Sequence, residues 1–305
     1  MPNVYLGINT CFAAKRWPEP ERWITLIKHE LGLDCCQFSF DLVDPALDAA
    51  AVAAYVDEVR TSAEKHQLLL HSTFTGLADY SWSQLLHPQE ALREAAQQWY
   101  RRAIDFTARL GARGTGGHVG ALGIQDFADA ERTRTLVKEM MERLNALAHY
   151  AAQKELDFLL FENMAVPREY GHTIEEAQSL LKNVSGGDQS VPLVLCLDVG
   201  HPCALHTGTS SDDYTVWLEQ PWVRTPVIHL QQTDRTTDHH WPFTAVYNQQ
   251  GIVRPEPVLR AVRQWSQRDD VYVFLEPIHP FEVDDTIVLN ELKESVNYWQ
   301  AAFKS

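Results

Sequence analysis

The chain has 305 residues, of which 45% are hydrophobic, and its 26 Lys and Arg against 41 Asp and Glu give a formal charge of −15. This charge argues against a nucleic-acid-binding surface, which depends on clustered Lys and Arg. No apolar stretch reaches the roughly 18 residues of a membrane span, and residues 1–10 lack a charged and apolar leader, so we expect a cytoplasmic protein. The five cysteines include no CxxC pair, and we expect reduced thiols with structural roles.

Eight short apolar runs alternate with helix-like stretches along the chain. The glycine-rich fourth run is the weakest strand candidate, and the runs span residues 4–9, 35–40, 68–73, 113–120, 157–163, 192–200, 226–232 and 271–277. Helical periodicity is present at residues 45–66 and 88–110, each with Pro in the first turn, at 127–154, and in a short segment at 212–220.

This alternation predicts a parallel sheet wrapped by helices. Eight units favour a (β/α)8 TIM barrel, an α/β fold, forming a single domain over residues 1–305. An open doubly wound sheet is the alternative, but no glycine-rich phosphate fingerprint follows the first strand.

Four of the later runs each end on an oxygen-bearing side chain, at spacings of 36, 33 and 45 residues: Glu162, Asp198, Gln231 and Glu276. A barrel collects its active site from the C-terminal ends of successive strands. Buried carboxylates are rare unless they are paired or hold a cation. Three carboxylates and an amide oxygen suit Mn²⁺, Co²⁺ or Mg²⁺ better than Zn²⁺. Capping of helix N-termini is the competing interpretation, and the recurrence over four strands favours a metal site.

Several short segments carry a resemblance to a known family. They are FEN at residues 161–163, the Asp-x-x-His of Asp198 and His201, HLQQTD at 229–234 and LEP at 275–277. The chain resembles the xylose isomerase-like barrels, which include ketose 3-epimerases and sugar-phosphate isomerases. Residues 6–23 and 231–243 further resemble the erythrulose-phosphate 3-epimerases. The resemblance implies that Glu162, Asp198 and Glu276 bind a divalent metal, that the two glutamates exchange a substrate proton, and that a homo-oligomer forms.

Two positions depart from the family pattern. The family commonly reads His-x-His on strand seven with the second His on the metal, whereas this chain has His229 and then Gln231. We favour Gln231 as the fourth ligand, with His229 as the alternative. The second departure is Arg168, where epimerases of free sugars often place an acid.

Basic and imidazole side chains follow several of the strands. Lys15, Arg16, Arg168, Arg235, His239 and His240 lie after strands one, five and seven. Cations at the mouth of a chain of this charge favour an anionic ligand such as a phosphate, with solvated loop charges as the alternative. We expect His71 and His118 to contact sugar hydroxyls and His201 to contact a substrate oxygen.

The sequence therefore predicts a metal-dependent epimerase of a short ketose phosphate, with Glu162 and Glu276 as acid and base around an enediolate. A free-ketose epimerase, an aldose–ketose isomerase and a metal-assisted lyase remain alternatives on the same barrel. An apurinic-endonuclease-type hydrolase is disfavoured by the charge of −15 and the single Asp-x-x-His. A non-catalytic sugar-binding barrel is disfavoured because both glutamates are present.

Overall fold

Eight parallel strands form one sheet in the computed structural model, which describes residues 2–184, 187–223, 225–265 and 270–304. The strands are adjacent in the order β3-β2-β1-β8-β7-β6-β5-β4. Their bounds are β1 Val4–Asn9, β2 Cys35–Ser39, β3 Leu69–Phe74, β4 Gly114–Gly117, β5 Phe158–Glu162, β6 Leu193–Asp198, β7 Val227–Leu230 and β8 Val271–Leu275. The predicted (β/α)8 barrel is confirmed, including its glycine-rich fourth strand.

Strands β3 and β4 lie side by side at the seam of the barrel. Two main-chain hydrogen bonds of 2.9 Å join this edge, from Arg113 N–H to the His71 carbonyl and from Thr75 N–H to the Gly116 carbonyl. Gly116 has a φ of +147°, and a Cβ at this position would collide with the carbonyl oxygen of Leu160 on β5. Glycine is therefore required for the close approach of β4 to β5.

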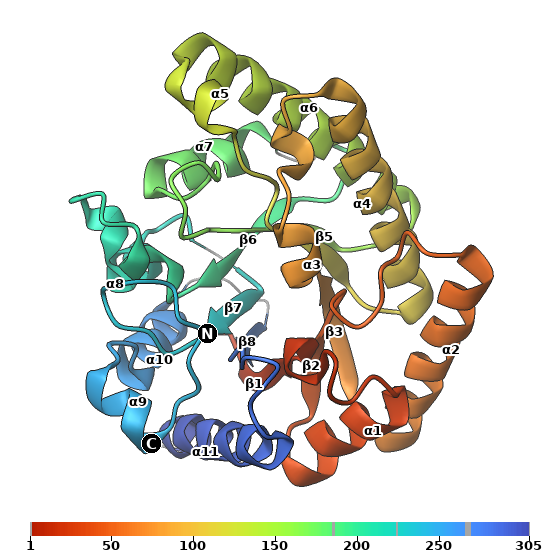
Figure 1. The fold of residues 1–305 in the computed structure, drawn as a ribbon, viewed down its shortest axis with the longest axis vertical. Coiled ribbons are helices and arrows are strands. Elements are labelled where there is room, and N and C mark those ends of the chain that lie inside the picture. The colour runs from red at the N-terminus through yellow and green to blue at the C-terminus, as the bar shows by residue number, and fades with distance from the viewer. Residues whose placement is uncertain (1, 185–186, 224, 266–269, 305) are drawn as a thin grey trace.

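Helices surround the sheet in chain order (Figure 1). Their bounds are α1 Pro20–Thr25, α2 Ala49–His66, α3 Gly76–Tyr80, α4 Glu90–Leu110, α5 Ile124–Ala128, α6 Ala130–Gln153, α7 Ile174–Asn183, α8 Tyr214–Glu219, α9 Ala245–Gln250, α10 Pro255–Gln264 and α11 Asp285–Phe303, with a short 3₁₀ segment η4 at His201–Ala204. The four predicted helical stretches correspond to α2, α4, α6 and α8. Because helices fill the outside of the sheet, the loops after the strands are free to build a site at one end.

The starts of α2 and α4 correct one expectation. Pro45 and Pro88 precede these helices rather than occupying their first turns. The start of α2 is set instead by Asp48, whose side chain accepts hydrogen bonds from two amides of the first turn. Asp129 caps α6 in the same way and separates it from the short α5.

The inside of the barrel has two layers of side chains. The lower layer is apolar and consists of Cys35, Phe158, Leu160, Cys196, Val227, Tyr272 and Phe274, with Phe74 at its upper edge beside His229. Side chains two residues apart on a strand share a face. The next inward positions toward the C-terminal ends of β5 to β8 are therefore Glu162, Asp198, His229 and Glu276, and these form the upper layer. Buried residues on the other face of each strand pack against the helices.

All five cysteines are free thiols, as the sequence predicts. Burial raises the pKa of Cys35 and of Cys196 to about 12, so both thiols stay protonated inside the barrel. In the part of the chain that the structure describes, no helix has the length and apolar composition needed to cross a bilayer.

Candidate active site

Four buried side chains converge where β5, β6, β7 and β8 end. Glu162, Asp198, His229 and Glu276 each offer one nitrogen or oxygen atom, and these atoms lie within 4.8 Å of one another. None of the four residues is more than 4% exposed. Three carboxylates at this separation and burial repel one another strongly unless positive charge lies between them.

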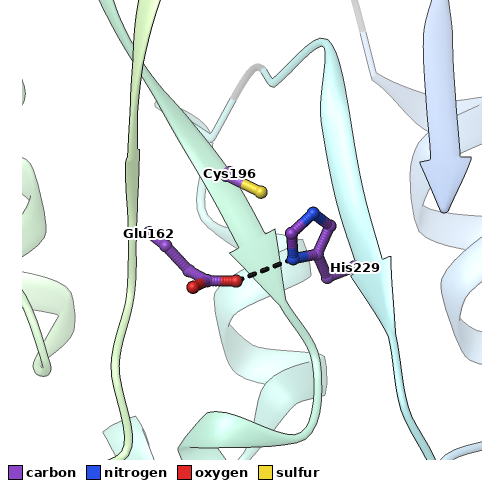
Figure 2. Close-up of side chains that lie close together, drawn as sticks. All are labelled: Glu162, Cys196 and His229. Atoms are coloured by element: carbon purple, nitrogen blue, oxygen red, sulfur yellow. Dashed lines mark hydrogen bonds and ion pairs between the residues drawn. The ribbon is translucent and has the colours of Figure 1, made fainter. Parts of the chain in front are cut away.

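His229 supplies contacts to two of the carboxylates. Its Nδ1 lies 2.8 Å from Glu162 Oε1 and 3.0 Å from Glu276 Oε2. Figure 2 shows Glu162 and His229 facing each other from β5 and β7, with Cys196 of β6 beside them. On its other side, Nε2 of His229 lies 2.6 Å from Oε1 of Gln37 on β2. Oε1 also accepts a hydrogen bond from the side chain of Asn9, so Nε2 of His229 is the donor in this contact.

The side chain of Asp198 has one oxygen engaged and one free. Its Oδ1 accepts hydrogen bonds from the main-chain amides of Gly200 at 2.6 Å and His201 at 2.9 Å. The side chain of Asn163 pairs with both main-chain groups of Asp198 and fixes its position. Oδ2 is buried and has no hydrogen-bond partner. A buried carboxylate oxygen without a donor, beside two further carboxylates, fits a divalent cation.

Gln231, the predicted fourth ligand, lies next to this cluster but is engaged otherwise. Its Oε1 accepts the main-chain N–H of His240 at 2.7 Å. Its Nε2 donates to Asp238 Oδ1 at 2.6 Å and to Asp198 Oδ1 at 3.3 Å. In this arrangement the amide presents hydrogen atoms to the carboxylates, whereas His229 presents a ring nitrogen to them.

The two glutamates have different environments. Burial raises the pKa of Glu162, although His229 opposes this shift. Burial acts in the same direction on Glu276, but the charge and hydrogen bond of His229, together with the charges of His240 and His201, outweigh it and lower the pKa of Glu276. Such a separation of two nearby carboxyl groups suits one acid and one base.

A pocket opens from this cluster to the end of the barrel. It has about 510 Å³ of space, counting its open mouth, and Glu162 and Glu276 line it together with His118, His201 and His240. Three of the predicted substrate contacts therefore reach the pocket. Its wall also includes Cys11, Asp41, Phe74, Gly76, Leu77, Tyr80, Met164, Asp238 and Ile278.

Two basic side chains that were predicted to contact the substrate, Lys15 and Arg16, do not line this pocket. Lys15 and Arg16 line a neighbouring hollow that shares Cys11 and Asp41 with the pocket. Arg16 is held there by Asp285 and by the carbonyl groups of Pro280 and Val283. Arg16 therefore binds the loop after β8 while it lines the hollow, and its contact to the substrate stays a prediction.

The remaining predicted contacts do not line the pocket. Arg168 donates to the Leu122 carbonyl at 3.0 Å, and Arg235 is exposed. His239 stacks on Trp241, with ring centroids 3.7 Å apart, and contacts Asp234. His71 stacks on Tyr272 of the lower layer with ring centroids 3.9 Å apart. The register of β3 places His71 in the apolar interior, below the level at which a sugar could reach it.

Besides Asp41, which lines the pocket, two acidic residues near the site were not predicted from the sequence. Asp238 lies in the loop after β7 and contacts both His201 and His240. Glu169 directly follows Arg168, and its buried Oε2 has no hydrogen-bond partner. Burial raises the pKa of Glu169 to about 7, with Tyr80 of the pocket wall as a neighbour. No strand ends at Asp238 or Glu169, so the pattern of strand ends could not indicate them. The only signal in the sequence was that an acidic residue directly follows Arg168.

The comparison with known protein families agrees with this architecture. The family described as xylose isomerase-like TIM barrel matches residues 27–276. The chain belongs to this family.

Three relatives indicate the range of the family. A D-erythrulose 1-phosphate 3-epimerase of Brucella abortus (strain 2308) is 26% identical over 300 residues, which cover 96% of this chain and 94% of the relative. A crystal structure described as a putative xylose isomerase from Rhodospirillum rubrum is 30% identical, with a TM-score of 0.90 over 98% of this chain and 99% of the other. An L-ribulose 3-epimerase, 17% identical with a TM-score of 0.70 over 99% and 96% of the chains, shares the fold.

Proposed function

We propose that the chain is a metal-dependent isomerase, an epimerase of a short ketose phosphate of the erythrulose-phosphate 3-epimerase type. The observation that carries this proposal is the pair of buried carboxylates, Glu162 and Glu276, on either side of His229 at the base of a pocket. The Brucella abortus relative, named as an erythrulose 1-phosphate 3-epimerase, supports the substrate class.

The residues that would hold the ion are Glu162, Asp198 and Glu276, with a fourth donor from β7. The unpartnered Oδ2 of Asp198 supports this assignment. His229 needs no rearrangement to serve as the fourth donor, whereas Gln231 must first turn its oxygen away from the His240 amide. When bound, a divalent ion such as Mn²⁺, Co²⁺ or Mg²⁺ supplies Lewis-acid stabilisation of negative charge on the substrate oxygens.

The two glutamates perform the proton transfers. One takes the proton from the carbon beside the ketose carbonyl, and the other returns a proton to the opposite face of the same carbon. His201 and His240 line the pocket and hold oxygen atoms of the substrate while the enediolate exists.

We expect the phosphate group of the substrate to bind in the hollow beside the pocket. It would then contact only some of the basic side chains predicted from the sequence. Lys15 lines this hollow and is exposed, with Nζ 4.3 Å from the ring centroid of Phe281. Arg168 and Arg235 do not line it. In this proposal the carbonyl group of the substrate lies at Glu162 and Glu276, and its anionic end lies at Lys15.

The test is metal analysis of the purified protein, followed by a panel of ketoses and ketose phosphates incubated in D₂O. We expect a bound divalent ion and, for one tetrulose phosphate, inversion of a single carbon with deuterium incorporated at that carbon. Faster turnover of free ketoses than of their phosphates would reject the phosphorylated substrate. An aldose product would indicate an aldose–ketose isomerase, and cleavage of a carbon–carbon or C-glycosidic bond would indicate a lyase.

The cytoplasmic location, the homo-oligomeric state and the single domain over residues 1–305 stay predictions. Size-exclusion chromatography with light scattering tests the oligomeric state, and limited proteolysis tests whether the chain behaves as one domain.

A further inference from the structure

A thiol lies beside the upper layer of the barrel, and the proposed function assigns it no task. Figure 2 shows Cys196 of β6 next to Glu162 of β5 and His229 of β7. The sulfur atom of Cys196, a carboxylate oxygen of Glu162 and a ring nitrogen of His229 all lie within 4.8 Å of one another. All three residues are buried, so these donor atoms face one another away from bulk water.

The sequence of β6 places this thiol directly beneath the carboxylate cluster. Cys196 and Asp198 are two residues apart, so both side chains point into the barrel, the first in the lower layer and the second in the upper layer. The thiol contacts His229, and Oδ2 of Asp198 is buried without a hydrogen-bond partner. Strand β6 therefore presents a sulfur donor and an oxygen donor, one above the other, to the inside of the barrel.

The donors around Cys196 differ in kind from the carboxylate cluster. Thiolate sulfur and imidazole nitrogen are preferred ligands of Zn²⁺, and one carboxylate oxygen gives it a third protein ligand. A tetrahedral zinc ion has ligand bonds of roughly 2.0–2.3 Å, which places its donor atoms about 3.3–3.6 Å apart. Because the three donors are at most 4.8 Å apart, movements of about 1 Å bring them onto one ion.

We propose that Glu162, Cys196 and His229 form an inner metal site for a thiophilic divalent ion, such as Zn²⁺ or Cd²⁺. As the metal–sulfur bond forms, the thiol releases its proton to solvent, because the thiolate is the ligand. Glu162 and His229 belong to both sets of donors, so an ion in the inner site competes with an ion at the carboxylate cluster.

Occupation of the inner site has a consequence for the chemistry. An ion bound there holds a carboxylate oxygen of Glu162 and prevents it from accepting a substrate proton. Zn²⁺ therefore inhibits the enzyme that Mn²⁺ or Mg²⁺ supports. This consequence rests on the proposed function, whereas the inner metal site itself does not.

The test is absorption spectroscopy of metal-stripped protein titrated with Co²⁺, with Cd²⁺ as a second probe. A thiolate ligand gives a sulfur-to-metal charge-transfer band in the ultraviolet, which carboxylate and imidazole ligands do not give. We expect this band for the wild type and its loss in Cys196→Ala. The variant should still bind Co²⁺ at the carboxylate cluster, as its visible bands will show. A large excess of Mn²⁺ should reduce the wild-type band, because the two ions compete.

The matched control is Cys35→Ala, which removes the other cysteine of the lower layer and should keep the band. Thermal melting verifies that each variant folds, and Cys196→Ser replaces Cys196→Ala if the latter does not. The proposal is overturned if the wild type shows no charge-transfer band with either ion, which would leave Cys196 as a packing side chain. It is also overturned if the band persists in the Cys196 variants. The measurement needs no turnover, so a band without epimerase activity rejects the proposed function alone, and epimerase activity without a band rejects this inference alone.

Discussion

The two layers inside the barrel are built from the same strands but perform different tasks. On β5, Phe158 and Leu160 belong to the apolar lower layer, and two residues further Glu162 belongs to the charged upper layer. On β8, Phe274 is followed in the same way by Glu276. The lower layer releases free energy through burial of apolar surface, whereas the upper layer holds carboxylates whose burial costs free energy. The residues that stabilise the fold and the residues proposed for the chemistry therefore lie two positions apart on the same strand. Substitutions in the lower layer should change stability, and substitutions in the upper layer should change turnover.

The largest expected effect is the loss of rate when either glutamate of the upper layer becomes an amide. Glu162→Gln and Glu276→Gln keep the size of the side chain and an oxygen ligand but remove the base, so each should reduce turnover about 10²- to 10⁴-fold. The measurement is epimerisation together with deuterium exchange in D₂O. The variant without the abstracting base should lose exchange, whereas the other should exchange without inverting the carbon.

Metal content and thermal melting are the controls for these two variants, because a lost ion would mimic a lost base. Near wild-type epimerisation by either variant with metal bound would contradict the two-glutamate mechanism.

The converse substitution removes a ring from the lower layer. Phe274→Ala leaves a cavity among fully buried side chains and should reduce the free energy of unfolding by about 3–5 kcal/mol. The folded fraction should retain its metal and most of its turnover at low temperature. Denaturant unfolding measures the stability, and Phe127→Ala on α5, where the ring is 45% exposed, is the control. If Phe274→Ala loses its metal while its stability is unchanged, the two layers are not independent.

The sequence predicted the strand ends well and the loops poorly, for a physical reason. A buried strand has a period of two, so the last inward residue of each run can be counted, and Glu162, Asp198 and Glu276 follow directly. Asp238 and Glu169 enter the site through loops, whose path depends on contacts such as the Trp241–Gln232 bridge. No local pattern encodes such contacts.

His71 and Arg16 show what chain order leaves open. Chain order places His71 on strand three and Arg16 after strand one. The contacts of each side chain depend on its depth in the barrel and on its hydrogen-bond partners, which chain order does not reveal. A register shift between β2 and β3 accompanies the placement of His71 beside Tyr272. The loop after β8 lies beside the segment that follows β1 and provides the acceptors for Arg16.

Glu169 allows a test of burial at the edge of the upper layer. Its pKa is about 7 in the folded chain against a model-peptide value of 4.5, so the folded state binds the proton more tightly than the unfolded state. This contribution to stability is complete below about pH 4.5 and is lost as the pH rises through 7. The change amounts to about 3 kcal/mol, and Glu169→Gln should remove it.

The measurement is denaturant unfolding of metal-free protein between pH 4.5 and 8. The exposed Glu94→Gln on α4 is the matched control and should keep the wild-type slope. Some slope should persist in Glu169→Gln, because burial also raises the pKa of Asp79 to about 7. A wild-type slope in Glu169→Gln would mean that this carboxyl group is not buried as described.

The smallest expected effect distinguishes the two candidate ligands on β7. If Nδ1 of His229 binds the ion, Gln37 fixes the ring through Nε2, and Gln37→Leu should weaken Mn²⁺ binding about 10- to 100-fold, as loss of a ligand's hydrogen-bond partner usually does. Gln231→Leu should then weaken it less, because this amide donates to Asp198 instead of presenting its oxygen. Competition of each variant with a fluorescent chelator measures the affinities, and Gln37→Glu should restore part of the loss by again accepting from Nε2. The opposite ranking, with Gln231→Leu losing the ion and Gln37→Leu keeping it, would show that the amide rotates on metal binding and would support Gln231 as the ligand that the sequence predicted.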